Sequence, residues 1–85
     1  MANVTVYIRD FCPYCTRALG LLKDRGVKPN VINAGADAKK KQEMVSRSNG
    51  GRTFPQIFIN DQHIGGCDDM MALDRRGGLD PLLSG

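Results

Sequence analysis

A short apolar run that leads into two cysteines constrains the fold of this chain more than any other feature. Residues Val4 to Ile8 are mostly β-branched or aromatic, which predicts a buried strand. After a short loop comes Cys12-Pro13-Tyr14-Cys15, whose proline suits the first position of a helix. Apolar residues then recur at helical spacing through Leu22, and Gly26 ends the helix. The pattern therefore predicts a strand followed by a helix that begins at a pair of cysteines.

The rest of the chain continues the alternation of strands and helices. Asp37 is a suitable N-cap for a second helix, and paired glycines end both this helix and a third one. The leucines around Pro81 predict only a last turn. The order β-α-β-α-β-β-α predicts an α/β fold in which helices flank a four-stranded mixed sheet. The later elements are expected as strands at 31–32, 55–59 and 62–64, a turn at 60–61, and helices from 37 to about 49 and from 68 onward.

Composition and charge exclude several classes of protein. The 85 residues are 41% hydrophobic and 25% charged, which fits a single globular domain over 1–85. The chain contains no run of ~20 apolar residues and no recognisable secretory signal, so we expect a cytoplasmic protein without a membrane partner. The net charge of +3 is small, and no aromatic residues interleave with Lys39-Lys40-Lys41. We therefore expect no nucleic-acid partner, and we expect a monomer.

The two cysteines at the predicted helix start point to redox chemistry. A helix N-terminus presents unpaired N–H groups and the positive end of the helix dipole, and both stabilise a thiolate. Cys12 lies just before the first turn, while Cys15 lies one turn inside the helix with its thiol directed back toward Cys12. Cys12 is therefore the candidate nucleophile, and Cys15 is the candidate resolving thiol.

A metal site is the alternative for the same cysteines. Cys12, Cys15, His63 and Cys67 have the spacing C-x2-C…H-x3-C, and all four are possible zinc ligands. However, His63 falls in a predicted strand, and a helix that starts at Pro13 differs from the usual zinc knuckle. The sequence favours the redox interpretation, so no metal is expected, and a visible absorption band would reveal an iron–sulfur cluster.

Several motifs together resemble one family. Cys12-Pro13-Tyr14-Cys15 with a following arginine looks like the active site of dithiol glutaredoxins of the bacterial type, and Thr53-Phe54-Pro55 resembles their T-V-P segment. The segment from Gly65 to Asp69 resembles their G-G-C-x-D segment, and Gly77-Gly78-Leu79 resembles the tail of bacterial members. The resemblance covers nearly the whole chain and implies a thioredoxin-like fold. Phe54 departs from the family, because valine is usual at its position.

The resemblance also implies a glutathione site. Asp68 and the backbone of Cys67 would hold the charged γ-glutamyl end of glutathione, and Arg9 would hold its glycine carboxylate. The Pro55 peptide bond would be cis, so that the backbone before it could pair with a peptide. Arg47 and Arg52 are weaker candidates for the glycine carboxylate. The implied glutathione-binding residues are Arg9, Tyr14, Thr53, Phe54, Pro55, Gly66, Cys67 and Asp68.

The function implied is that of a glutathione-dependent thiol–disulfide oxidoreductase. Such an enzyme reduces glutathione mixed disulfides through Cys12 alone and protein disulfides through Cys12 and Cys15. Glutathione would act as a co-substrate, and glutathionylated or disulfide-bonded proteins would be the partners. Two alternatives remain at this point: a thioredoxin-like electron donor that takes electrons from a reductase, and a module that binds a metal or an iron–sulfur cluster through the same cysteines.

Overall fold

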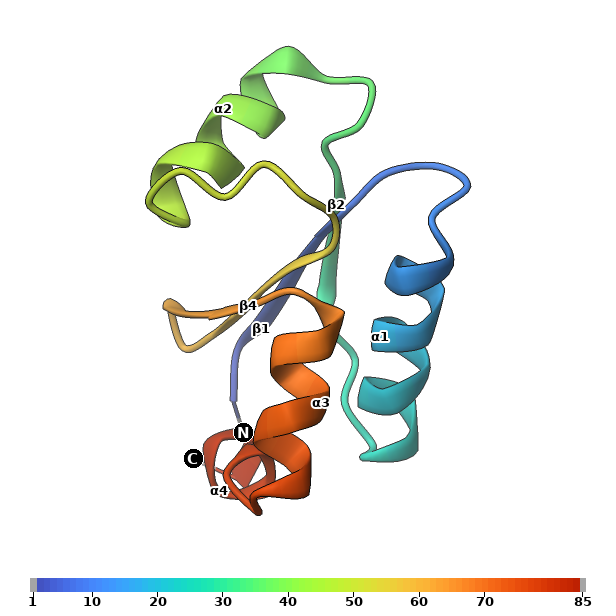
Figure 1. Cartoon of the computed structure of the whole chain (residues 1–85), viewed down its shortest axis with the longest axis vertical. Coiled ribbons are helices and arrows are strands. Elements are labelled where there is room, and N and C mark those ends of the chain that lie inside the picture. The colour runs from blue at the N-terminus through green and yellow to red at the C-terminus, as the bar shows by residue number, and fades with distance from the viewer. Residues whose placement is uncertain (1, 85) are drawn as a thin grey trace.

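The computed structural model describes residues 2–84 and contains the expected four-stranded mixed sheet. The strands lie in the order β2-β1-β3-β4, where β1 pairs in parallel with β2 and antiparallel with β3, and β3 pairs antiparallel with β4. Figure 1 shows this sheet with its helices. The strands are β1 (Val4–Ile8), β2 (Asn30–Asn33), β3 (Gln56–Ile59) and β4 (Gln62–Gly65). The helices are α1 (Pro13–Asp24), α2 (Ala38–Arg47), α3 (Cys67–Arg75) and α4 (Leu79–Ser84).

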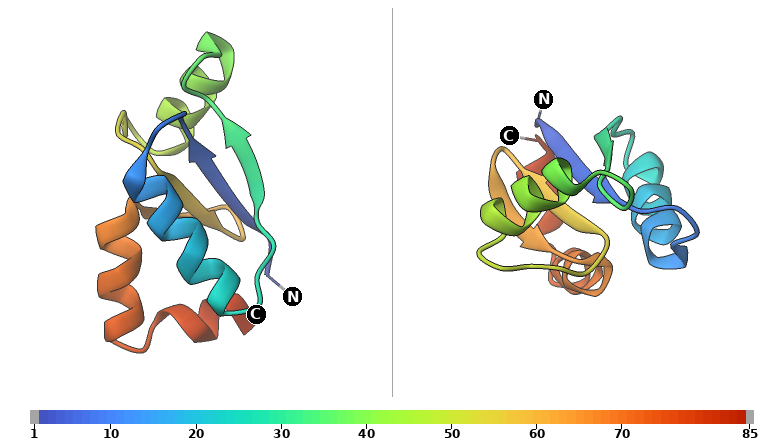
Figure 2. Two further views of the ribbon diagram at one scale, coloured as in Figure 1. Left: turned by 90° about the vertical axis from the view of Figure 1, so that its right-hand side faces the viewer. Right: turned by 90° about the horizontal axis from the view of Figure 1, so that it is seen from above.

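The two faces of the sheet carry two separate apolar clusters. On one face Val4, Val6 and Ile57 pack with Ala18 of α1 and Met70 of α3. On the other face Tyr7 and Phe58 pack with Met44 of α2. Alternate residues of a strand point to opposite faces, so β1 contributes to both clusters. Figure 2 shows α2 on the other side of the sheet from α1 and α3.

Local sequence signals account for most of the element boundaries. Asp37 caps α2 by accepting the backbone N–H groups of Lys39 and Lys40. The β3–β4 hairpin turns at Asn60 and Asp61, which both have positive φ, the backbone region that a tight two-residue hairpin requires. These residue types tolerate that region better than most others.

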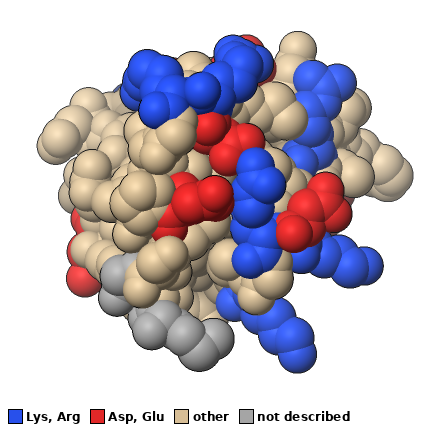
Figure 3. All heavy atoms as spheres, turned by 90° about the horizontal axis from the view of Figure 1, so that it is seen from below, with Lys and Arg blue, Asp and Glu red and all other residues tan. Residues whose placement is uncertain are grey.

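The segment after α3 differs from the expectation of a single turn. Residues Leu79–Ser84 form the short helix α4, and Leu79 is buried in the cluster that also contains Met70. Pro81 lies in the first turn of this helix, where a missing N–H costs no hydrogen bond. Arg25 at the end of α1 contacts Asp74 of α3 at 2.7 Å and Asp80 of α4 at 3.4 Å. On this end of the molecule, side chains of opposite charge lie next to one another (Figure 3).

Candidate active site

Cys12 is the N-cap residue of α1. Its backbone is extended, with φ of −114° and ψ of 102°, and its sulfur accepts the backbone N–H of Cys15 at 3.2 Å. The carbonyl of Cys12 accepts the first helical hydrogen bond, from the N–H of Thr16. The first turn of α1 contains no acidic residue that would compete for the helix N-terminus. The sulfur therefore occupies the position where a helix stabilises negative charge.

Cys15 lies one turn further along, with only 3% of its surface exposed. Burial, followed by its hydrogen bond with Cys12, raises the pKa of Cys15 to about 11, and a hydrogen bond from the Arg9 backbone opposes that shift. A thiol with so high a pKa keeps its proton at neutral pH, so Cys15 can donate a hydrogen bond to the sulfur of Cys12. The sulfur of Cys12 can thus accept hydrogen bonds from both the backbone and the thiol of Cys15. No disulfide joins them here.

A groove of about 290 Å³ is lined by Cys67 but by neither Cys12 nor Cys15. This volume is at the lower edge of the usual range for ligand pockets, about 300–1,000 Å³. The sulfur of Cys12 lies 3.9 Å from the carbonyl oxygen of Phe54, which lines the groove, and the Phe54–Pro55 peptide bond is cis, as the family resemblance implied. The side chain of Phe54 also packs against the cluster on the α2 face. The lining residues are Tyr14, Gly51, Thr53, Phe54, Pro55, Gln56, His63, Gly65, Gly66, Cys67, Asp68 and Asp69.

The N-terminus of α3 forms one side of this groove. Gly66 is the N-cap residue, and Asp69 reaches back so that its Oδ2 atom accepts the Gly66 N–H at 3.0 Å. Gly65 has φ of +117°, and a Cβ atom there would lie 2.3 Å from the same Asp69 oxygen, so the turn into α3 requires glycine. Asp69 therefore stabilises the start of α3. Asp68 is exposed and forms no ion pair or hydrogen bond with residues 2–84.

Cys67 contributes a buried thiol to the groove. Burial, followed by the charge of Asp68, raises the pKa of this thiol above its ordinary value. The Cys67 thiol therefore remains protonated at neutral pH, whereas a nucleophilic cysteine reacts as a thiolate.

A chain of hydrogen bonds under the groove was not anticipated from the sequence. The Nε2 atom of His63 lies 2.7 Å from Oε1 of Gln56, and the Gln56 amide donates to the carbonyl and the hydroxyl of Thr53 at 3.0 and 3.1 Å. Gln56 is a polar residue in a fully buried strand. A glutamine in an otherwise apolar strand, directly after Pro55, was the sequence signal for this hydrogen-bond network. The chain fixes the orientation of Thr53 at the edge of the groove.

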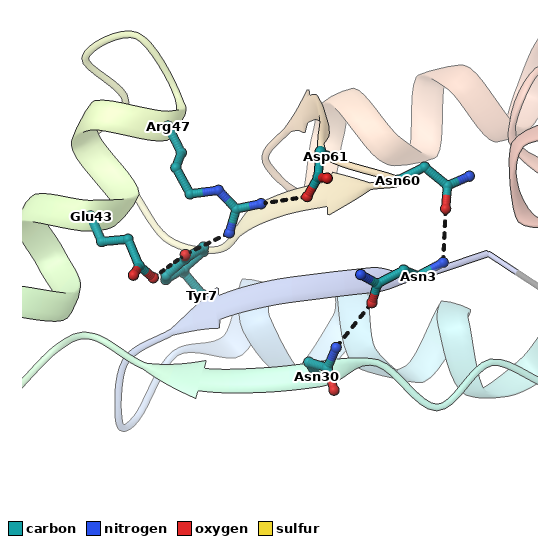
Figure 4. Close-up of polar contacts among 7 residues, drawn as sticks. All are labelled: Asn3, Tyr7, Asn30, Glu43, Arg47, Asn60 and Asp61. Carbon is teal, nitrogen blue, oxygen red and sulfur yellow. Dashed lines mark hydrogen bonds and ion pairs between the residues drawn. The ribbon is translucent and has the colours of Figure 1, made fainter.

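The candidate cations are placed differently from the other predicted residues. Arg9 does not line the groove; its guanidinium donates to the carbonyl oxygens of Asp10 and Phe11 at 3.1 Å each. Arg47 lies over the ring of Phe58, at 4.3 Å from the ring centroid, and donates to the hydroxyl of Tyr7 at 2.7 Å. Figure 4 shows Arg47 between Tyr7 and Asp61. Every predicted glutathione-binding residue except Arg9 lines the groove.

The four residues of the zinc alternative do not form a ligand set. His63 packs against the ring of Phe58, whose centroid is 5.0 Å from its own, and bonds to Gln56. Within the described range 2–84, no three His, Cys, Asp or Glu side chains are placed to hold a metal ion.

Among residues 2–84, no helix is both long and apolar enough to cross a bilayer.

Comparison with known proteins identifies the family. The glutaredoxin family model matches residues 4–64. Glutaredoxin 3 of Escherichia coli is 57% identical over 83 residues, which cover 98% of this chain and 99% of that protein. The chain belongs to the glutaredoxin family. Like the family, it is a glutathione-dependent thiol–disulfide oxidoreductase with the thioredoxin-like fold.

Further relatives and solved structures agree with this assignment. A probable glutaredoxin of Synechocystis sp. is 51% identical over 82 residues, covering 96% of this chain and 93% of that protein. The solution structure of a glutaredoxin from Brucella melitensis has a TM-score of 0.84 at 49% identity, with 98% of this chain and 89% of that chain covered. A buckwheat glutaredoxin–glutathione complex has a TM-score of 0.85 at 33% identity, with 98% and 77% covered. Glutathione is thus the co-substrate of this glutaredoxin-family chain.

Proposed function

We propose that Cys12 is the nucleophile of this oxidoreductase and that its substrates are glutathionylated proteins and protein disulfides. One observation carries the proposal. The sulfur of Cys12 accepts an N–H group at a helix N-terminus, beside a groove that the N-terminus of a second helix, α3, also borders. A nucleophile and an anion-binding helix start therefore meet at the same groove.

In the first route Cys12 acts alone. Its thiolate attacks the glutathione sulfur of a mixed disulfide, and the protein leaves as a thiolate that takes up a proton. Glutathione remains bound to Cys12 as a disulfide. A second glutathione thiolate then attacks that glutathione sulfur, so that oxidised glutathione leaves and the Cys12 thiolate is restored. A stabilised thiolate is a good leaving group in this last step.

In the second route Cys15 is also required. Cys12 attacks one sulfur of a protein disulfide, and the other substrate sulfur leaves as a thiolate. Cys15 then loses its proton and attacks the sulfur of Cys12, which releases the second substrate thiolate and forms a Cys12–Cys15 disulfide. Two glutathione molecules supply the two electrons that reduce this disulfide. Because the pKa of Cys15 is raised to about 11, a base from the substrate or solvent must accept its proton during the attack.

We assign the glutathione molecule to the groove. The exposed, unpaired Asp68 would bind the γ-glutamyl ammonium, and the backbone N–H of Cys67 at the start of α3 would bind its carboxylate. Thr53 and the backbone on either side of Pro55 would pair with the tripeptide as an added strand does. Tyr14 would line the groove, and Arg9 would bind the glycine carboxylate through its Nη2 group while its Nη1 atom keeps its bonds to the loop carbonyls.

Three further statements complete the proposal. We propose that residues 1–85 form a single glutaredoxin domain, that the protein is a monomer, and that it works in the cytoplasm. Three free cysteines and a dithiol site suit a reducing compartment. The bacterial relatives of similar length support the assignment of one domain.

A coupled assay distinguishes this proposal from a thioredoxin-like electron donor. Glutathione, glutathione reductase and NADPH are supplied with a small glutathione mixed disulfide, and NADPH oxidation is followed. In a parallel reaction thioredoxin reductase replaces glutathione and glutathione reductase. We expect turnover only in the glutathione system. Turnover with thioredoxin reductase alone would favour the electron-donor alternative.

A further inference from the structure

Of the three large apolar side chains that are exposed among residues 2–84, two lie within two residues of Cys12. Phe11 is 98% exposed and Tyr14 is 53% exposed, while the third, Val31, lies on the edge strand β2 and is 48% exposed. Tyr14 lines the groove, so bound glutathione would cover part of it. Phe11 is not among the residues that line the groove, and it contacts almost nothing in the folded chain. No packing within the molecule explains an aromatic ring at this position.

The backbone holds Phe11 in an unusual conformation. Its φ is +55°, in the left-handed region that bulky residues rarely adopt. A bulky residue held in this backbone conformation, with a side chain that packs against nothing, is a candidate for a functional role. Here the conformation directs an apolar ring into solvent, one residue before the nucleophile.

The neighbouring residues fix this loop rather than leave it free. The Arg9 guanidinium donates to the carbonyl oxygens of Asp10 and Phe11, and the Asn33 amide donates to the Asp10 carboxylate at 2.9 Å. Gly35 packs so closely that a Cβ atom there would lie 2.6 Å from the Cβ of Arg9. The aromatic ring is therefore presented from a pre-ordered loop, which lowers the entropy lost when a partner binds.

We propose that Phe11 determines specificity for protein disulfides whose cysteines are flanked by apolar residues. This inference rests on the proposed function of Cys12. When Cys12 attacks a protein disulfide, the substrate polypeptide becomes attached to the Cys12 sulfur, and its flanking side chains come to lie against the loop that carries Phe11. When Cys12 attacks the glutathione sulfur of a mixed disulfide, the group attached to Cys12 is glutathione, which lies in the groove. Phe11 therefore affects the reduction of protein disulfides and not the reduction of glutathione mixed disulfides.

The test uses two cyclic peptides of equal length, each closed by one disulfide, with either leucine or serine next to the cysteines. The kcat/KM of each peptide is measured with glutathione as reductant, and a small glutathione mixed disulfide provides the reference activity. We expect the protein to prefer the leucine peptide about fivefold, as partial burial of one apolar contact predicts. Phe11→Ala should lose this preference, Phe11→Leu should keep most of it, and Val31→Ala, which changes an exposed apolar residue on β2, should keep all of it.

The possible outcomes separate the two proposals. Phe11→Ala could instead lower the activity toward the leucine peptide, the serine peptide and the small mixed disulfide equally. Phe11 would then stabilise the conformation of the loop before Cys12, and the specificity inference would be wrong. An absence of preference in the unaltered protein would also overturn it, while the proposed function would stand. No turnover of the small mixed disulfide by the unaltered protein would instead contradict the proposed function.

Discussion

The helices α1 and α2 begin with nearly the same backbone geometry but with different chemistry. The N-cap residue of α1, Cys12, has φ and ψ of −114° and 102°, and that of α2, Asp37, has −125° and 107°. The Cys12 sulfur accepts one backbone N–H at 3.2 Å, and the Asp37 carboxylate accepts two, at 3.0 and 3.1 Å. Neither helix has an acidic residue in its first turn.

The difference shows what a helix N-terminus can be used for. The Asp37 carboxylate accepts backbone N–H groups at the start of α2, so its interaction with the helix stabilises the fold. A thiol is mostly protonated at neutral pH, so the same interaction at Cys12 favours the reactive form. The start of α3 differs from both. Its N-cap residue, Gly66, has no side chain to cap the helix, and the first residues of α3 line the groove. We therefore assign the three helix starts to catalysis, stability and ligand binding.

The largest expected effect comes from Cys12→Ser. Serine is a good N-cap residue, so the free energy of unfolding should change little. All reduction of disulfides should be lost, because neither Cys15 nor Cys67 is a thiolate at neutral pH. Coupled assays and urea denaturation of the same preparation check both expectations.

Cys15→Ser is the matched control for this variant. It should keep the reduction of glutathione mixed disulfides, which needs one thiol, and lose the dithiol reduction of protein disulfides. Equal loss of both activities in Cys15→Ser would contradict the one-cysteine route. A large loss of stability in Cys12→Ser would mean that sulfur stabilises the start of α1 in a way that an oxygen cannot.

Asp68→Ala tests the third helix start. Loss of one charge-assisted hydrogen bond lowers affinity roughly tenfold to a hundredfold, so the glutathione concentration needed for half-maximal rate should rise by about that factor. The rate of Cys12 alkylation by iodoacetamide should stay the same. Arg9→Ala should have a smaller effect, because an exposed ion pair is screened by solvent. Unchanged glutathione kinetics in Asp68→Ala would place the ligand outside this groove.

The sequence predicted those parts of the molecule that depend on local chemistry. Pro13 and Asp37 indicated where two helices begin, and the cysteine pair indicated the reactive site. The helix α4 was not predicted, because its six residues include Pro81 and gain stability from tertiary burial of Leu79. The resemblance to a family supplied the cis bond before Pro55, since composition alone favours the trans form.

Other features depend on contacts between distant residues, which no local pattern encodes. Gln56 bonds to His63 across the β3–β4 hairpin. Arg47 was a weaker candidate for binding the glycine carboxylate, yet it stacks on Phe58, from a different element. The left-handed backbone of Phe11 is likewise held by the side chain of Arg9, so the sequence around Cys12 did not predict the direction of the aromatic ring.

Asp37→Ala is the counterpart of Cys12→Ser at α2 and should have the opposite result. Removal of an N-cap carboxylate lowers the free energy of unfolding by about 1 kcal/mol, which corresponds to a decrease in Tm of roughly 4–8 °C for a domain of this size. Enzymatic rates should be unchanged, because α2 lies on the face of the sheet away from Cys12. Asp37→Ser retains a capping oxygen and should restore most of the stability. A decrease in activity at full occupancy by glutathione would show that α2 and the active site are coupled.

The last effect concerns the proton on Cys15 and appears only at alkaline pH. Burial and the hydrogen bond with Cys12 raise the pKa of Cys15 from 9.0 to about 11 in the folded protein. Between these two values the unfolded chain has already released the proton while the folded protein still holds it. Stability must therefore fall as pH rises from 9.0 toward about 11, since the folded state binds more protons there.

The measurement is the free energy of urea unfolding under reducing conditions, from about pH 8 to about pH 10. Tyr7 and Cys67 also have raised pKa values and contribute a decrease of the same sign, so the informative quantity is the difference in slope between proteins. Cys15→Ser should have a shallower slope because it has no proton to lose at this position. Cys12→Ser should lie between the two, since burial of Cys15 remains while the hydrogen bond from its thiol to a Cys12 thiolate is gone. If Cys15→Ser and the unaltered protein had the same slope, Cys15 would not hold its proton above its ordinary pKa, and it would not be the thiol donor to the sulfur of Cys12.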